Sequence, residues 1–286
     1  MTIAPAPKPL SLDALLKESW HLFKRNWIVA LPPFIAMFAI IVVATVLVIV
    51  CISAAVAHGN PDHWSGGFIA ALAGAYLMLI AFILLASLWA GVATFGMADA
   101  AWERGTTTLG DGIASFGARA GAAFVACVGI FGLAIAAIIL FLPTLGLSVL
   151  ALPFVTMYAF PAIVTGRRGG FEAIRESFLL VRHFFGSSAL VYLVLYAIQY
   201  GISLLMIAAI VPLEFAIIPL GGGDTTFRMP SLPLLGFSGT LYMVTIVALI
   251  AYNGFHTLAL VGMYRDLLAQ PANPALPPGS GAIVQA

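Results

Sequence analysis

The sequence predicts an all-α, polytopic membrane protein with six transmembrane helices, arranged as three hairpins that are each preceded by a short amphipathic interfacial helix. Three observations predict this fold class. The chain is 62% hydrophobic and only 8% charged, whereas a soluble domain carries about 25% charged residues. Its apolar blocks exceed the roughly 20 residues that cross a bilayer as a helix. A charged motif also recurs between these blocks.

The first predicted element is an amphipathic helix that follows an N-terminal tail of residues 1–10. Ser11 is suited to cap this helix, and Asp13 and Lys17 are spaced for an i,i+4 ion pair. The apolar side carries Leu12, Leu15, Leu16, Ser19, Leu22 and Phe23. The polar side carries Asp13, Lys17, His21 and Lys24. Such a helix lies in the plane of the membrane interface.

The six spans are predicted from hydropathy, with their ends placed at Gly, Pro and charged residues. They lie near 28–57, 68–98, 120–142, 147–166, 187–219 and 233–262. The fourth span contains Pro153 and Pro161, so we expect a kink there. Residues 11–268 are predicted to form one membrane domain, and 269–286 a disordered tail rich in Pro, Gly and Ala.

The distribution of basic residues predicts the orientation in the membrane. One side of the predicted topology holds Lys8, Lys17, Lys24, Arg25, Arg104, Arg119, Arg167, Arg168, Arg175, Arg182 and Arg265, and the other side holds only Arg228. Because basic loops stay in the cytoplasm, both termini are expected to be cytoplasmic. The net charge of +1 argues against a nucleic-acid partner.

A charged motif recurs before the odd-numbered spans. "LLKESWHLFKRNW" begins at Leu15, and "AIRESFLLVRHFFG" begins 158 positions later at Ala173. A weaker third copy, "GIASFGARAG", contains Ser115, Phe116 and Arg119. The simplest interpretation is three repeats, near 11–101, 106–166 and 170–266, each formed by an interfacial helix and a transmembrane hairpin.

The recurring motif supplies candidate residues that face lipid headgroups. In the second copy the spacing predicts an apolar face of Phe171, Ile174, Phe178, Val181 and Phe185. The predicted polar face holds Glu172, Arg175, Glu176, Arg182 and His183. The candidate headgroup-facing residues are Lys17, Lys24, Arg119, Arg175 and Arg182. The alternative interpretation is a structural elbow that only orients the next span.

Two passages carry a resemblance to a known family. "MYAFPAIVTGRRGGFEAIRESFLLVRHFFG" and the ending "GFHTLALVGMYRDLL" are similar to the membrane domain of some glycerophosphoryl diester phosphodiesterases, which also occurs in free-standing bacterial membrane proteins. The resemblance covers about residues 12–268 and implies a six-helix envelope protein. It carries no catalytic residue onto this chain, because the family's catalytic module is a separate soluble barrel for which this sequence has no room.

Polar residues within the predicted spans are the other candidates, because such residues are costly in hydrocarbon and usually functional. They are Gln199, Glu214, Asn253 and His256. Asn253 and His256 share a helix face and are expected to reach Gln199 or Tyr200, either as polar contacts between helices or as part of a proton or substrate path. Glu214 is either a site residue or an interfacial loop carboxylate. Asp99 is either solvated at the cytoplasmic end of its span or paired with a basic residue of a neighbouring interfacial helix.

No phosphate-binding loop, nucleophile elbow or zinc-protease motif occurs in the sequence. We therefore expect no enzymatic activity, no cofactor and no metal. The predicted function is that of an integral protein of the bacterial inner membrane, acting in envelope maintenance by binding anionic lipid headgroups or membrane-protein partners, including further copies of itself. The alternative is a transporter or lipid-translocating protein with a site between its helices.

Overall fold

The computed structural model describes residues 11–59, 65–217 and 232–270, and in these ranges every regular element is a helix. In chain order the elements are α1 (Leu12–Arg25), the 3-10 helix η1 (Trp27–Ala30), α2 (Leu31–His58), α3 (Gly66–Arg104), α4 (Leu109–Ile139), α5 (Leu147–Val155), α6 (Ala159–Val164), α7 (Gly170–His183), α8 (Phe185–Ile217) and α9 (Leu232–Ala269). The described residues contain six segments long and apolar enough to cross a membrane, which confirms a multi-pass, all-α chain.

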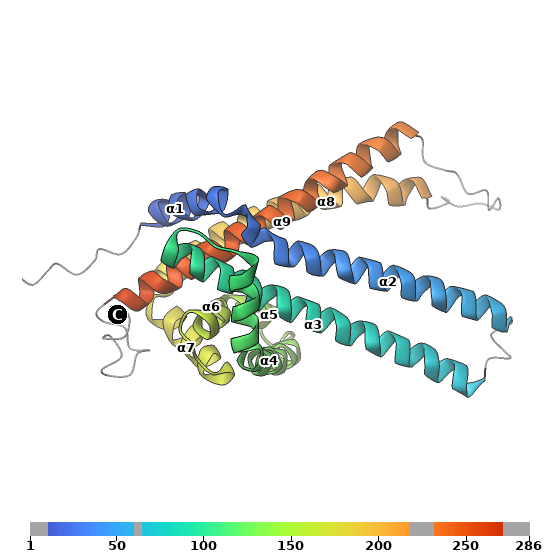
Figure 1. The fold of residues 1–286 in the computed structure, drawn as a ribbon, viewed down its shortest axis with the longest axis horizontal. Coiled ribbons are helices and arrows are strands. Elements are labelled where there is room, and N and C mark those ends of the chain that lie inside the picture. The colour runs from blue at the N-terminus through green and yellow to red at the C-terminus, as the bar shows by residue number, and fades with distance from the viewer. Residues whose placement is uncertain (1–10, 60–64, 218–231, 271–286) are drawn as a thin grey trace, which may run out of the picture.

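Four of the long helices form two pairs that extend from one packed end of the molecule (Figure 1). α2 packs against α3, and α8 packs against α9. The short helices α5, α6 and α7 gather with α4 beside the C-terminal half of α3, and α1 lies along α9. This arrangement brings α1 and α7, which are distant in the sequence, to the same end of the bundle.

The buried core lies at this packed end. It contains fully buried residues from the C-terminal halves of α3 and α9, including Val92, Met97, Leu258 and Val261. In the most apolar stretches of α2 and α3, by contrast, only 6% and 0% of the residues are buried. Apolar side chains on the surface of the protein are stable against the hydrocarbon of a bilayer, so these stretches are suited to face lipid. The same end carries Asp99, Arg104, Arg168, Glu176 and Arg265, and we call it the charged end.

Glycines on α9 allow the close approach of α1. A Cβ atom at Gly262 would lie 2.4 Å from Cζ2 of Trp102 and 3.0 Å from Cδ1 of Leu15. A Cβ atom at Gly254 would lie 2.8 Å from Cε2 of Phe23. Since real side chains do not tolerate such distances, larger residues at these positions would push α1 away from α9.

The fourth span is broken rather than merely kinked. α5 ends at Val155, a turn follows, and α6 begins at Ala159. The hydroxyl of Ser177 on α7 donates to the carbonyl oxygen of Val155 (2.7 Å) and accepts from the amide of Tyr158 (3.1 Å). A break inside a membrane span leaves backbone groups without helical partners. Ser177, fully buried, supplies two of the missing hydrogen bonds.

Some predicted boundaries differ from the structure. The third copy of the charged motif does not form a separate interfacial helix, because α4 runs without a break from Leu109. Its start is fixed by Thr108 and Asp111, which form a capping box. α3 and α9 extend to Arg104 and Ala269, beyond the predicted span ends at 98 and 262. The tail at 1–10 and most of the tail at 269–286 lie outside the described residues.

Candidate functional site

The helices α1 and α7 correspond to each other position by position. Both are 14 residues long, and their bounds are offset by the same 158 positions as the sequence motif. Each ends at a residue that leaves the helical conformation, Asn26 (φ −124°, ψ 45°) and Phe184 (φ −108°, ψ 43°), before the next helix begins. The two segments therefore make the same turn towards the span that follows each of them.

Burial also agrees at corresponding positions of α1 and α7. The matched pairs are Leu15 with Ala173, Ser19 with Ser177, and Phe23 with Val181, and all six side chains are buried. On each helix these positions are separated by four residues, so they form one stripe that faces the protein. Both helices thus dock on the bundle through the same face.

The exposed positions of the two segments repeat an aromatic, basic, aromatic order. The first triplet is Trp20, Lys24 and Trp27, and the second triplet is Phe178, Arg182 and Phe185. The aromatic rings are 50%, 62%, 49% and 62% exposed, in that order. Both basic side chains are exposed. The first two residues of each triplet are four apart on one helix and share a face, and the third follows the non-helical residue Asn26 or Phe184.

The remaining headgroup candidates lie in different surroundings. Lys17 and Arg175, which also correspond in the motif, are both exposed. Lys17 forms an ion pair with Asp13 at 2.7 Å, as the sequence predicts. Arg119 is half-buried within α4 and does not belong to a separate interfacial helix. The structure therefore brings Lys17, Lys24, Arg175 and Arg182 onto two similar surfaces, and Arg119 onto neither.

The predicted faces of α7 are partly wrong. Within the predicted apolar face, Phe171 and Phe178 are 65% and 49% exposed, whereas Val181 is buried. Glu176, predicted to be on the polar surface, is only 5% exposed. The reason is that α7 approaches α4 through its smallest residues: a Cβ atom at Gly170 would lie 2.5 Å from the carbonyl oxygen of Ala122. The larger rings are left on the outer side.

Glu176 forms a buried polar connection that the sequence did not reveal. Its carboxylate accepts a hydrogen bond from the hydroxyl of Tyr264 on α9 (2.5 Å). It also forms an ion pair with Arg168, whose Nε lies 2.5 Å from Oε2. A buried carboxylate needs such compensation, because an unpaired charge would be strongly destabilising. Glu176 therefore holds α7 to α9 and to the loop before α7.

A second polar connection lies next to it on α9. Arg265 forms an ion pair with Asp99 of α3 at 3.1 Å, and the hydroxyl of Thr165 donates to the same carboxylate at 2.9 Å. Asp99 is thus paired rather than only solvated at the helix end, and its partner belongs to α9 and not to an interfacial helix. Together the two connections fix α3, α7 and α9 relative to one another at the charged end.

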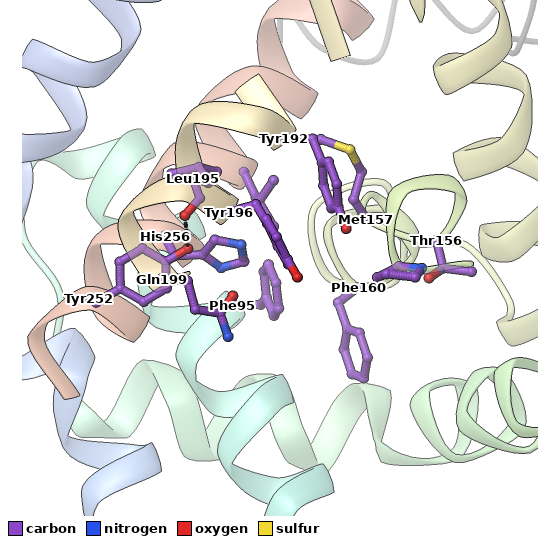
Figure 2. A pocket seen from close by; sticks show the side chains of 12 residues that line it. Phe95, Thr156, Met157, Phe160, Tyr192, Leu195, Tyr196, Gln199, Tyr252 and His256 are labelled. Atoms are coloured by element: carbon purple, nitrogen blue, oxygen red, sulfur yellow. Dashed lines mark hydrogen bonds between the residues drawn. The ribbon is translucent and has the colours of Figure 1, made fainter. Parts of the chain in front are cut away.

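The polar residues within the spans lie around two cavities. Gln199 and His256 both line a first cavity of about 470 Å³ (Figure 2). Asn253 and His256 line a second cavity of about 490 Å³. The Asn253 amide donates to the carbonyl oxygen of Leu249 in its own helix (3.0 Å), rather than to Gln199 or Tyr200 as expected. The side chain of Glu214 lies outside the described residues.

The sequence analysis missed three tyrosines of the first cavity, Tyr192, Tyr196 and Tyr252. On α8 the sequence held a usable signal, because Tyr192, Tyr196 and Tyr200 recur every four residues on one face of that helix. In the structure these three rings are stacked, with centroid distances of 5.8 and 6.4 Å.

Among the described residues, no group of three His, Cys, Asp or Glu side chains is placed to hold a metal ion. Cys51 and Cys127 are free thiols. Comparison of the chain with protein-family models, with curated proteins and with solved structures finds no match.

Proposed function

We propose that this chain is a non-enzymatic integral protein of the bacterial inner membrane, which binds anionic lipid headgroups through its two triplets and acts in envelope maintenance. One observation carries the proposal. Two segments 158 residues apart expose the same aromatic, basic, aromatic order at matched positions, while their other faces are buried in the bundle. Trp20 and Phe185 each contact one ring of the bundle, Phe255 and Phe154, but about half or more of the surface of each triplet ring stays exposed, at 49–62%.

Physical chemistry favours lipid as the partner of these surfaces. Aromatic rings at an interface enter the boundary between headgroups and acyl chains. A Lys or Arg near an anionic surface contributes about 1 kcal/mol of attraction. A triplet such as Trp20, Lys24 and Trp27 combines both contributions in one short segment. A membrane-protein partner or a second copy of this chain is the competing occupant, since aromatic residues and Arg are also enriched in protein interfaces.

The proposal includes the arrangement and the orientation of the chain. We propose three repeats, each with a transmembrane hairpin, of which the first and third keep their interfacial helices α1 and α7. The identical lengths and offset of these helices support this arrangement. The resemblance to the membrane domain of glycerophosphoryl diester phosphodiesterases is consistent with it. The basic residues of the charged end support a cytoplasmic location for both termini.

Lipid selectivity tests this function directly. The full-length chain would be extracted in native-membrane nanodiscs, and the retained lipids would be quantified by mass spectrometry. We expect anionic lipids to be enriched over the bulk membrane, and the Lys24→Gln, Arg182→Gln double variant to lose this enrichment. The matched control is Arg25→Gln with Arg167→Gln, which removes two exposed positive charges of the charged end outside the triplets.

The outcomes separate the candidates. Equal enrichment in the double variant and in wild type, or equal loss in the control, would rule out the triplets as the headgroup site. If the wild type is an oligomer that dissociates when Trp20 and Phe178 are changed to Ser, while its lipids are unaltered, the triplets are a protein interface.

A second candidate function, transport or lipid translocation, is favoured by the meeting of Gln199 and His256 at one cavity. Transporters place polar groups near the membrane midplane between packed helices. Solute or lipid movement in proteoliposomes that Gln199→Leu abolishes would support it. If solutes and lipids move no faster in the proteoliposomes than in protein-free vesicles, the transport function is ruled out.

A further inference from the structure

The first cavity has flat aromatic walls. It lies between α3, α5, α6, α8 and α9, and five of its twelve lining residues carry a Phe or Tyr ring (Figure 2). The rings are those of Phe95, Phe160, Tyr192, Tyr196 and Tyr252. Phe95 and Phe160 are stacked at a centroid distance of 5.6 Å with an interplanar angle of 11°. Stacked pairs present broad ring faces, and such faces favour a planar ligand.

Two side chains with nitrogen donors, Gln199 and His256, line this cavity without a hydrogen-bond partner among the described residues. Within residues 11–59, 65–217 and 232–270, neither the amide of Gln199 nor the imidazole of His256 forms a hydrogen bond with a protein group. Both lie near the middle of their spans, Phe185–Val211 and Gly236–Ala269. Polar groups at this depth normally find partners, because hydrocarbon offers none. A ligand with hydrogen-bonding atoms would satisfy them.

The hydroxyl of Tyr252, unlike the side chains of Gln199 and His256, forms a hydrogen bond within the protein. It donates to the carbonyl oxygen of Leu195 on α8 at 2.8 Å (Figure 2). This bond fixes the ring as part of the cavity wall and joins α8 to α9. The side chains available to orient a ligand by hydrogen bonds are therefore Gln199, His256 and the hydroxyls of Tyr192 and Tyr196, and of these only Gln199 and His256 offer N–H donors.

The charge of the lining restricts the ligand further. None of the described residues around the first cavity is an Asp, Glu, Lys or Arg. A charged ligand would thus enter an apolar region without a counter-charge, which is strongly unfavourable. A volume of about 470 Å³ lies within the range of small-molecule sites. The fitting ligand is neutral, planar and soluble in the membrane.

We propose that the first cavity binds a lipid-soluble molecule of the quinone class, a neutral planar ring that carries carbonyl oxygens. The ring lies between the aromatic walls, and its oxygens accept hydrogen bonds from the Gln199 amide and from the imidazole N–H of His256. This site is separate from the two triplets, so it stands or falls independently of the headgroup function.

Equilibrium binding of a short-chain ubiquinone to the full-length chain in nanodiscs tests the proposal. We expect saturable binding, and the Gln199→Leu, His256→Phe double variant to weaken it at least tenfold. His256→Gln retains a hydrogen-bond donor and should keep most of the affinity. Ser87→Ala, a change in the second cavity, should leave binding unchanged. Thermal unfolding of each variant verifies that the bundle is intact.

A competing probe identifies what the cavity recognises. Decanol has an apolar chain and a hydroxyl but no ring, and we expect it not to displace the quinone. Displacement by decanol at similar concentration would overturn the proposal in favour of a general site for acyl chains. Absence of saturable binding, or equal affinity in the double variant, would overturn it outright. The Lys24→Gln, Arg182→Gln variant should bind the quinone normally, which separates this test from that of the headgroup function.

Discussion

The hydroxyl of Tyr264 on α9 donates a hydrogen bond to the buried carboxylate of Glu176 on α7, across 88 residues of sequence. Arg168 holds the other oxygen of that carboxylate. The next residue on α9, Arg265, holds Asp99 of α3. Two consecutive residues of α9 thus join this helix to α7 and to α3, at the end of the molecule where the buried core lies. This relationship explains why a carboxylate is tolerated in a mostly apolar interior.

Removing the tyrosine hydroxyl should destabilise the bundle. We expect Tyr264→Phe to lower the free energy of unfolding by about 1.5–3 kcal/mol, the usual contribution of a hydrogen bond to a charged group. Denaturant titration of the purified chain would measure this. Tyr76→Phe, at a 63% exposed ring of α3, is the matched control and should be neutral. Equal stability of Tyr264→Phe and wild type would show that Arg168 alone compensates Glu176.

The two corresponding serines should respond differently to the same substitution. Ser177→Ala removes both hydrogen bonds at the break between α5 and α6, so we expect a loss of about 1–3 kcal/mol. The hydroxyl oxygen of Ser19 is buried and, among the described residues, has no hydrogen-bond partner. Ser19→Ala should therefore be neutral or stabilising. Comparable unfolding curves for the two variants would contradict this assignment.

A methyl group on α9 should detach α1. In Gly262→Ala the new Cβ atom would meet the Trp102 ring and Leu15, so we expect α1 to loosen and trypsin to cleave faster after Lys17 and Lys24. Gly117→Ala is the control, because no atom lies within 4 Å of its added Cβ. Cleavage that is equally slow in both variants would mean that the α1 contact adjusts without loss.

The proposed orientation predicts the labelling of introduced cysteines. In a chain with Cys51 and Cys127 replaced by Ala, Glu103→Cys lies at the charged end, and Gly67→Cys lies at the opposite end of α3. A membrane-impermeant thiol reagent should label only Gly67→Cys in intact spheroplasts and only Glu103→Cys in inverted vesicles. The reverse pattern would place both termini outside the cytoplasm.

The sequence predicted the membrane class and the approximate spans because hydropathy over 20 residues depends little on tertiary contacts. It did not show which apolar residues of α7 pack on the bundle, because side chains such as Phe178 and Val181 are suited equally to lipid and to protein, and periodicity does not distinguish the two. Glu176 looked like a surface residue because its partner Tyr264 is distant in the sequence. Pro153 and Pro161 predicted only a kink in the fourth span, and the hydroxyl that completes the break after Val155 comes from another helix.

The position of the core has a mechanical consequence. Protein packing joins the helices near one membrane surface, while the apolar stretches of α2 and α3 are almost unburied. In the opposite leaflet, lateral pressure and acyl-chain length act on helix pairs that few protein contacts restrain. We therefore expect the spacing between the α2–α3 pair and the α8–α9 pair to follow the thickness and composition of the bilayer, with the charged end as the fixed point.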